Sequence, residues 1–339
     1  MKSRNRKLII GIAVLAVILG VSYVLRSDRQ SEEGKSGEEI DSALFNSGSM
    51  TDERLTSYHQ FIRSGGPPPD GIPPVDEPVY ESMTEADLNM ADQDVVFIVE
   101  ADGEVFLYPQ RILVWHEIVN EEFDGEKVSI TYCPLTGSAI GFKGRFQGIE
   151  TDFGTSGKLI NSNLVMYDRE TDSYFPQILA IAVEGDMKGQ RLEEFPVVWS
   201  TWGRAKAHYD EALVLSEETG FIRDYNWDPY GGYVESSGYY FDDALLYPVM
   251  FEDDRFQTKE PVIAGRVKDL PFAILKSSLA EEKVITFTVG EHSLVAEYDE
   301  ELDSARVFID EEEGETPVNS FDVMWFAWYA FFPETMIYE

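Results

Sequence analysis

The sequence is poor in cysteine, histidine and basic residues. Among 339 residues it has one cysteine, Cys133, and four histidines. One thiol cannot form a disulfide within the chain, and so few cysteines and histidines argue against a zinc site. The 27 Lys and Arg residues face 63 Asp and Glu, which gives a formal net charge of −36. The basic surface that nucleic acid requires is therefore missing, and nucleic acid is excluded as a partner.

The N-terminus combines a short basic stretch with a long apolar run. Four basic residues precede the uncharged span Leu8–Leu25. This span is long enough for one transmembrane helix and longer than the core of most signal peptides. We predict a retained membrane anchor over residues 1–25, with the basic end inside and the rest of the chain outside. Small residues at positions 20–22 leave cleavage as an open alternative.

Beyond the anchor the composition changes twice. Residues 26–64 begin with a stretch rich in Ser, Glu and Gly that has too few apolar residues to fold by itself. We predict a polar tether over residues 26–64 and a single β-rich domain over residues 65–339. The domain would be extracytoplasmic, either periplasmic or at the cell surface. The membrane is the one predicted partner, and a protein or small-molecule partner stays open.

Turn signals and alternating apolar residues predict the elements of the domain. Asp102-Gly103 between two apolar runs, 95–99 and 105–108, predicts a β-hairpin. Alternation over Val128–Cys133 predicts a strand. Further strands are expected over 138–142, 164–167, 178–183, 213–215, 284–289, 293–298 and 305–309, and helices over 111–119, 201–212 and 323–332. We find no internal repeat in the sequence. The fold class is α+β and β-rich, with largely antiparallel sheets and a few short helices.

Seven blocks in a fixed order carry a resemblance to a known family. They are residues 66–73 (GPPPDGIP), 108–120 (YPQRILVWHEIVN), 131–139 (TYCPLTGSA), 153–157 (FGTSG), 161–169 (NSNLVMYDR), 223–231 (RDYNWDPYG) and 325–328 (WFAW). Together they resemble domain-of-unknown-function family 3179, a family of uncharacterised bacterial and archaeal envelope proteins. The likeness extends over about residues 65–338, which is nearly the whole predicted domain.

The resemblance implies thiol redox chemistry without defining a reaction. Similar proteins usually have a second cysteine three residues after the first, and some have selenocysteine there. In this chain Cys133 occupies the first position and Thr136 the second. A cycle that uses two thiols of the same chain is therefore not available here.

Cys133 is the leading candidate for a catalytic residue. It ends a predicted strand, and Thr136 could donate a hydrogen bond to its thiolate across the turn. His116 lies 17 residues earlier, and a chain that folds back would bring it beside the strand end. The three residues would then form an activated nucleophile. The alternative is a buried structural cysteine and a structural histidine, because cysteine is among the most buried residue types.

A loop rich in aromatic and acidic residues supports a second hypothesis, a non-catalytic binding module. Its candidate ligand-binding residues are Arg223, Asp224, Tyr225, Asp228 and Tyr230. The alternating acidic residues partly match a calcium-binding loop, but proline 229 stands where such loops need glycine. We assign no cofactor and no metal ligand, and a divalent cation stays open. The plainer interpretation is a turn whose aromatic residues fill the core.

Polar residues on either side of a short strand are also candidates for ligand binding. They are Asn161, Asn163, Asp168 and Arg169. Loops at the edge of a rigid sheet often carry binding residues, but the same side chains also form turns with the backbone. A third hypothesis is a purely structural envelope protein that needs neither the thiol nor a cation.

Overall fold

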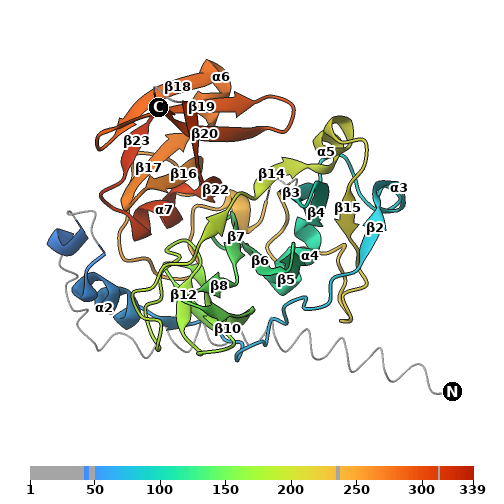
Figure 1. The fold of residues 1–339 in the computed structure, drawn as a ribbon, viewed down its shortest axis with the longest axis horizontal. Coiled ribbons are helices and arrows are strands. Elements are labelled where there is room, and N and C mark those ends of the chain that lie inside the picture. Colours follow the sequence, from blue (N-terminus) through green and yellow to red (C-terminus); the bar gives the residue numbers. More distant parts are fainter. Residues whose placement is uncertain (1–41, 46–49, 234–236, 312–313) are drawn as a thin grey trace. The chain divides into compact units, whose positions relative to one another are not determined.

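The computed structural model describes residues 42–45, 50–233, 237–311 and 314–339 (Figure 1). Several antiparallel sheets and short helices over these residues confirm a β-rich α+β fold. The predicted anchor over residues 1–25 and most of the predicted tether lie outside the described residues. Within the described ranges, no helix is long and apolar enough to cross a membrane.

The chain before the main sheets contains short elements. They are η1 (Ser42–Phe45), α2 (Asp52–Gln60), β1 (Arg63–Ser64), β2 (Tyr80–Ser82) and α3 (Met83–Ala86). Thr51 caps α2 with its side chain, and Arg54, Leu55 and Tyr58 of this helix are buried. The predicted tether therefore extends too far, because its last part folds into a helix that packs through one apolar and two amphipathic side chains.

A group of nine elements forms what we call the first copy. They are β3 (Val95–Ala101), β4 (Glu104–Pro109), α4 (Gln110–His116), β5 (Ile118–Phe123), β6 (Glu126–Cys133), β7 (Ser138–Lys143), β14 (Val198–Thr201), α5 (Trp202–His208) and β15 (Leu213–Leu215). β3 pairs antiparallel with β4 and β14, and β15 pairs parallel with β4. β5, β6 and β7 form an antiparallel meander.

A second group repeats this order and pairing, and we call it the second copy. It consists of β16 (Pro261–Val267), β17 (Leu270–Leu275), α6 (Lys276–Glu282), β18 (Val284–Val289), β19 (His292–Asp299), β20 (Ser304–Glu311), β22 (Ser320–Met324), α7 (Trp325–Phe331) and β23 (Met336–Tyr338). β16 pairs antiparallel with β17 and β22, and β23 pairs parallel with β17. β18, β19 and β20 form the corresponding meander.

The repeat also holds at single residues of the helix ends. Helices α4 and α6 both have seven residues and are followed by a non-glycine residue with positive φ, Glu117 at 60° and Lys283 at 68°. The carbonyl of Glu117 accepts a hydrogen bond from the amide of Tyr132, and the carbonyl of Lys283 accepts one from the amide of Tyr298. Glu117 and Lys283 are therefore equivalent positions.

The turns after β6 and β19 correspond in the same way. Cys133 pairs with Ser138 across one turn, and Asp299 pairs with Ser304 across the other. Each turn has four residues between the paired positions, so Cys133 is equivalent to Asp299. The sequence-based statement that the chain has no internal repeat is wrong. The copies share backbone geometry and apolar pattern, whereas their polar residues differ.

Two long connections belong to the neighbourhood of the first copy. Between β7 and β14 the chain forms β8 (Arg145–Phe146), β9 (Ile149–Glu150), β10 (Phe153–Ile160), β11 (Asn163–Asp168), β12 (Tyr174–Pro176) and β13 (Glu194–Phe195). Residues 216–260, with η2 (Tyr239–Phe241), join the copies. In the second copy, the described residues between β20 and β22 form only β21 (Gly314–Val318).

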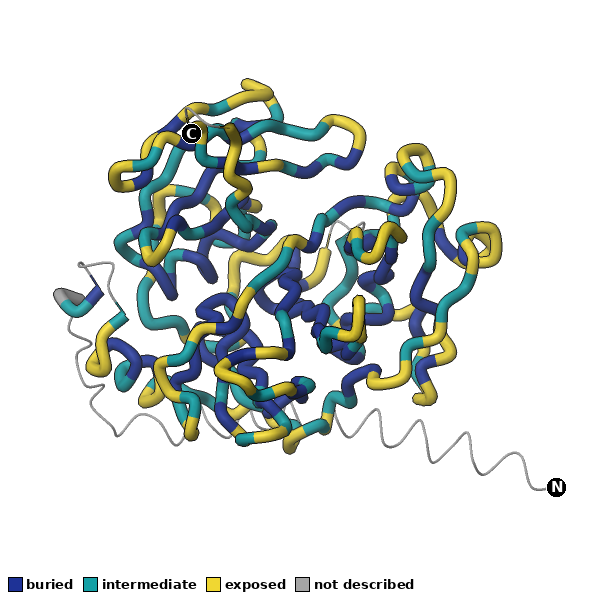
Figure 2. The backbone as a smooth tube through the Cα atoms, viewed as in Figure 1, coloured by how far each residue is buried: buried dark blue, intermediate teal, exposed yellow. Residues whose placement is uncertain are grey.

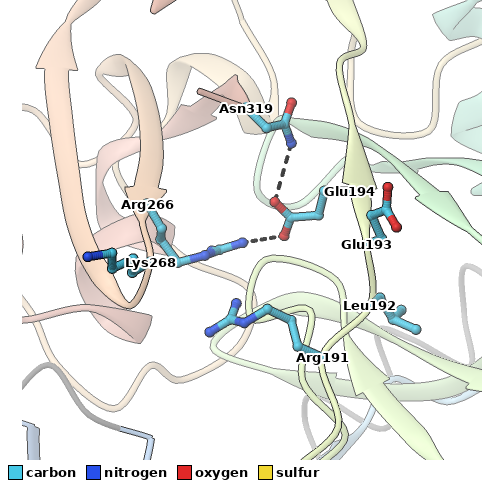
Figure 3. A pocket seen from close by; sticks show the side chains of 7 residues that line it. All are labelled: Arg191, Leu192, Glu193, Glu194, Arg266, Lys268 and Asn319. Carbon is cyan, nitrogen blue, oxygen red and sulfur yellow. Dashed lines mark hydrogen bonds and ion pairs between the residues drawn. The ribbon is translucent and has the colours of Figure 1, made fainter. Parts of the chain in front are cut away.

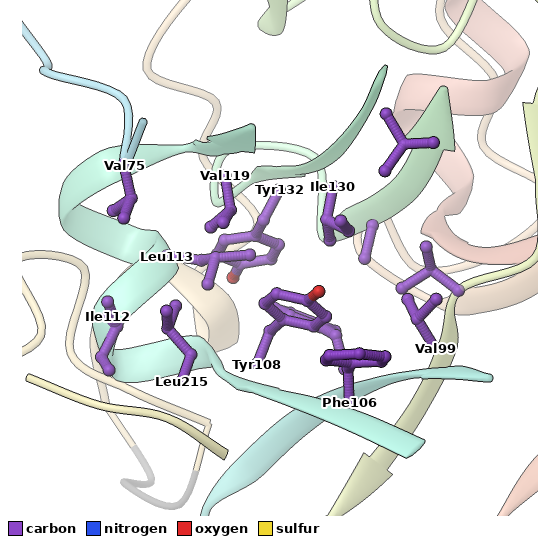
Figure 4. Packing of buried hydrophobic residues seen from close by; sticks show 14 of the residues in the cluster. Val75, Val99, Phe106, Tyr108, Ile112, Leu113, Val119, Ile130, Tyr132 and Leu215 are labelled. Carbon is purple, nitrogen blue, oxygen red and sulfur yellow. The ribbon is translucent and has the colours of Figure 1, made fainter. Parts of the chain in front are cut away.

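Each copy has its own apolar core. In the first copy, Leu113 of α4 points into a cluster with Val119, Ile130 and Tyr132 of the meander (Figure 4). The second core gathers side chains such as Phe272 and Leu294. Figure 2 shows the resulting pattern, in which buried positions follow the strands and exposed positions concentrate in turns. The alternating strand patterns of the sequence thus place one face of each sheet in a core.

Four predicted elements differ from the structure. Residues 178–183 form a buried turn with isolated bridges instead of a strand, and Ala180 has a φ of 57° that a strand does not allow. The predicted helices over 111–119 and 201–212 end earlier, at His116 and His208. The last helix begins only at Trp325, because the residues before it pair with β16 as β22.

Candidate functional site

Cys133 lies at the end of β6 and is almost completely buried. Its relative exposure is 1%. The Sγ atom accepts a hydrogen bond from the amide of Leu164 at 3.3 Å and lies 3.8 Å from the carbonyl oxygen of Ser162. Both contacts come from the β10–β11 hairpin, which is separated from β6 by about thirty residues of chain. The first long connection therefore reaches the thiol directly.

Thr136 is held beside Cys133 by a buried polar network. Its hydroxyl oxygen accepts a hydrogen bond from Nδ2 of Asn163 at 3.0 Å, and Asn163 also donates to Oε1 of Gln177 at 2.9 Å. Gln177 in turn accepts from Ser138 at 2.7 Å. All four of these polar side chains are buried. Such a fully paired network fixes the turn after Cys133 in one conformation. The structure thus places Thr136 beside Cys133, as the sequence suggested, and adds Asn163, which the sequence had assigned to a separate group of ligand-binding candidates.

His116 is not part of this arrangement. Its Nδ1 lies 2.7 Å from the carbonyl oxygen of Pro73, and its Nε2 lies 2.7 Å from the hydroxyl of Tyr225. Both ring nitrogens are therefore occupied by groups other than the thiol. Burial lowers the pKa of His116 to about 4, so the ring is neutral at physiological pH. The pairing of His116 with Cys133 that the sequence suggested is not formed.

Glu117 is the ionisable residue that the structure places near the thiol. It follows α4 in the left-handed conformation, and it is 9% exposed. Burial raises the pKa of Glu117 to about 8. Burial also raises the pKa of Cys133 to about 11, and the Glu117 charge adds to this increase. Hydrogen bonds from Thr136 and the amide of Leu164 lower the thiol pKa only in part. Glu117 and Cys133 are therefore both largely protonated at neutral pH.

Tyrosine side chains from the second long connection cover the same turn. The hydroxyl of Tyr239 donates to the carbonyl of Leu135 at 2.7 Å. The ring of Tyr230 packs edge-on against that of Tyr239, with 5.9 Å between the ring centroids. Burial raises the pKa of Tyr230, and the charges of Glu117 and Cys133 raise it further. Through Tyr239, Tyr230 thus belongs to the cover of the Cys133 turn.

The other residues predicted beside the β10–β11 hairpin serve the backbone or lie elsewhere. Asn161 donates to the carbonyl of Ala330 at 2.9 Å and accepts from the amide of Met250 at 2.8 Å. Asp168 accepts amide hydrogen bonds from its own turn. Arg169 forms an ion pair with Asp76 at 2.8 Å and lines an open hollow of about 310 Å³. These three residues do not contact the thiol.

The acidic side chains that the structure describes in this loop, up to residue 233, do not gather into a cation site. Asp224 is exposed and accepts from the amide of Asn226, whereas Asp228 accepts from Gln110 at 3.0 Å. Tyr225 is buried against His116, and Arg223 lies over the ring of Trp115. No group of three or more His, Cys, Asp or Glu side chains within the described ranges could hold a metal ion. Most aromatic residues of this loop pack on the first copy.

The family comparison covers this whole site. Residues 69–335 match the model of a family described as "Protein of unknown function (DUF3179)". The chain belongs to this family. Within the DUF3179 match lie Glu117, Cys133 and both long connections. No curated protein and no solved structure matches the chain.

Sequence reasoning missed Glu117 and Gln177 as members of the site. The available signal was a single acidic residue inside the apolar run from Val114 to Val119. Where the neighbouring residues face the core, a glutamate either buries its carboxyl group or turns its side chain away from the core. The position of Glu117 next to the strand of Cys133 depends on the turn after α4, where its carbonyl accepts from the amide of Tyr132, and no spacing in the sequence defines that turn.

Proposed function

We propose that the protein catalyses thiol–disulfide exchange, with Cys133 as the nucleophile and Glu117 as the group that accepts and returns the thiol proton. A carboxyl group whose pKa of about 8 lies near the working pH is suited to this proton transfer. The sequence-based hypothesis of thiol chemistry is kept, and Glu117 takes the role first given to His116. Thr136 remains the residue that stabilises the thiolate.

The comparison of the two copies supports the proposal most strongly. The same backbone carries a buried Cys133 and Glu117 in the first copy, and a partly exposed Asp299 and an exposed Lys283 in the second. The fold therefore does not require an acid and a thiol at these positions. Both long connections also converge on the Cys133 turn. Buried ionisable groups that the scaffold does not need are characteristic of functional sites.

The proposed step balances in protons and electrons. The ionised form of Glu117, which is populated as pH approaches about 8, takes the proton from Sγ, and the thiolate attacks one sulfur of a disulfide substrate. A bond forms between Cys133 and that sulfur, the substrate S–S bond breaks, and the leaving thiolate takes the proton back from Glu117. An external thiol then attacks the mixed disulfide and restores the Cys133 thiol. The external thiol fills the role that a second cysteine at position 136 would have.

The buried thiol is the unreactive form of the site. A protonated, buried cysteine reacts slowly, so the tyrosine cover, formed by Tyr230 and Tyr239, must open before a disulfide can reach Sγ. The hydrogen bond between Tyr239 and Leu135 is one contact that would break. The predicted export of the domain fits this substrate class, because disulfides persist outside the cytoplasm.

The test measures formation of a mixed disulfide between the full-length protein and oxidised glutathione at pH 8, by mass spectrometry over time. We expect E117Q to slow the reaction by about 10²-fold or more, as removal of a general base does. We expect C133S to give no adduct. Since the Glu117 charge raises the thiol pKa, a purely structural Glu117 predicts faster reaction in E117Q. An unchanged or faster rate in E117Q would overturn the proposed role.

A further inference from the structure

A second polar site lies away from Cys133, in a hollow that three cationic side chains line. The hollow measures about 260 Å³, and the cations are Arg191, Arg266 and Lys268. Arg191 precedes β13, Arg266 lies on β16, and Lys268 is in the turn after it. Two acidic residues, Glu193 and Glu194, also line it. The chain as a whole has 27 basic and 63 acidic residues, so the hollow is richer in basic residues than the chain.

Of the two carboxylates in the hollow, Glu194 holds Arg266 in place and Glu193 pairs with Lys143 at 2.5 Å, so neither is the ion-pair partner of Arg191. Glu194 accepts from Arg266 through one oxygen and from Nδ2 of Asn319 at 3.2 Å through the other. Figure 3 shows both contacts, with the guanidinium of Arg191 making none to the side chains drawn. The partner of Arg191 is Asp269 at 2.8 Å, which does not line the hollow.

Arg191 and Arg266 repel each other across this site. Burial lowers the pKa of Arg191, and the charge of Arg266 lowers it further. Arg266 cannot move away, because its side chain is 5% exposed and also donates to the carbonyl of Ile178 at 2.8 Å. An anion between the two guanidinium groups would relieve the repulsion. Lys268 is 72% exposed and 3.7 Å from Glu291, so its ammonium group is free to turn toward such an anion.

We infer that this hollow binds a small, doubly charged oxyanion such as phosphate or sulfate. Arg191 supplies the planar pair of donors that matches oxyanion geometry, and Lys268 supplies a mobile charge. Arg266 is held in place by Glu194, and its positive charge attracts the anion from the buried side of the hollow. The volume is several times the roughly 30 Å³ that one water molecule occupies in the liquid, so a hydrated oxyanion fits.

The test is calorimetric titration of the full-length protein with inorganic phosphate and, separately, with sulfate and acetate. A chloride concentration of about 0.15 M screens the long-range repulsion from the acidic surface. We expect one site with a dissociation constant of about 1 mM or below for phosphate and sulfate. R191Q and K268Q should each weaken binding about tenfold. R306Q removes an exposed arginine that pairs with Glu297, and it should leave binding unchanged.

Three results would contradict the inference. They are the absence of heat at phosphate concentrations up to about 50 mM, equal weakening by R306Q and R191Q, and acetate binding as tight as phosphate binding. The first would show that the present ion pairs satisfy the cations. The second would show an effect of overall charge, and the third would show that a second anionic charge is not recognised. Thermal unfolding of each variant checks that R191Q and K268Q retain the fold.

Discussion

The two copies present the same turn to different surroundings. In the second copy, Asp299 accepts amide hydrogen bonds from Glu301 and Leu302 at 2.9 and 3.1 Å, as turn-forming aspartates do. Lys283, half-exposed, forms a surface ion pair with Glu300. In the first copy, the equivalent positions hold a buried thiol and a buried carboxyl group. One backbone thus supports either a solvated turn or a buried pair of acids.

Each turn also packs on the other copy, but with different partners. The carbonyl of Thr136 accepts from the amide of Met324 at 2.9 Å, and the carbonyl of Leu302 accepts from the hydroxyl of Ser200 at 2.6 Å. Of the two turns, only the Cys133 turn also contacts the β10–β11 hairpin and the tyrosine cover. The chemistry of the site therefore comes from the connections that surround the repeated scaffold, while the scaffold supplies its position.

The largest expected effect comes from exchanging the equivalent residues. E117K places an ammonium group in a buried site, which we expect to lower the free energy of unfolding by about 3 kcal/mol or more. K283E changes an exposed position and adds a like charge beside Glu300, which we expect to cost about 1 kcal/mol at most. Urea denaturation of both variants measures the difference. Equal losses would mean that the two positions have similar environments.

A smaller effect is expected from E117Q, and it depends on pH. The pKa of this carboxyl group is about 4.3 in an unfolded chain, and it is about 8 in the folded protein. The folded state therefore keeps a proton that the unfolded state loses. The resulting stability is full at about pH 4 and is lost as pH rises toward about 8. Glutamine cannot lose this proton, so E117Q should gain stability relative to wild type as pH rises.

We expect this gain to be on the order of 1–4 kcal/mol between about pH 5 and pH 8.5. Urea denaturation at the two pH values measures it. His116 and Glu121, whose pKa values are also shifted by burial, are present in both proteins and cancel. E122Q changes an exposed residue on β5, the strand that follows Glu117, and serves as the control. A gain that is the same at both pH values would contradict the assignment of a raised pKa to Glu117.

The sequence predicted well those features that depend on neighbours along the chain. Asp102-Gly103 produced the β3–β4 hairpin, and alternation produced β6 with Cys133 at its end. Thr136 lies beside Cys133 because it belongs to the turn that follows this residue, which has only four residues before Ser138. Apart from residues 66–68 at the start of the first block, the blocks that suggested the family lie in the matched range, residues 69–335.

Features that depend on distant segments were not predictable in this way. The amide on Sγ belongs to Leu164, and the network behind Thr136 includes Gln177. His116 had the right spacing but turned toward Pro73 and Tyr225. The repeat escaped notice because Glu117 and Lys283, although equivalent in φ and hydrogen bonding, have opposite charges. The apolar pattern that the copies share is an alternation common to many strands, so it does not by itself identify a repeat.

The coupling of Cys133 with Glu117 is tested most directly by the ionisation of the thiol itself. Because the chain has one cysteine, ¹³Cβ-cysteine labelling gives a single resonance whose chemical shift reports thiolate formation without any reagent entering the site. We expect wild type to titrate well above the unperturbed value of about 8.5, toward a pKa of about 11. E117Q should titrate at lower pH than wild type. A wild-type midpoint near about 8.5, or the same midpoint in both proteins, would contradict a buried thiol coupled to Glu117.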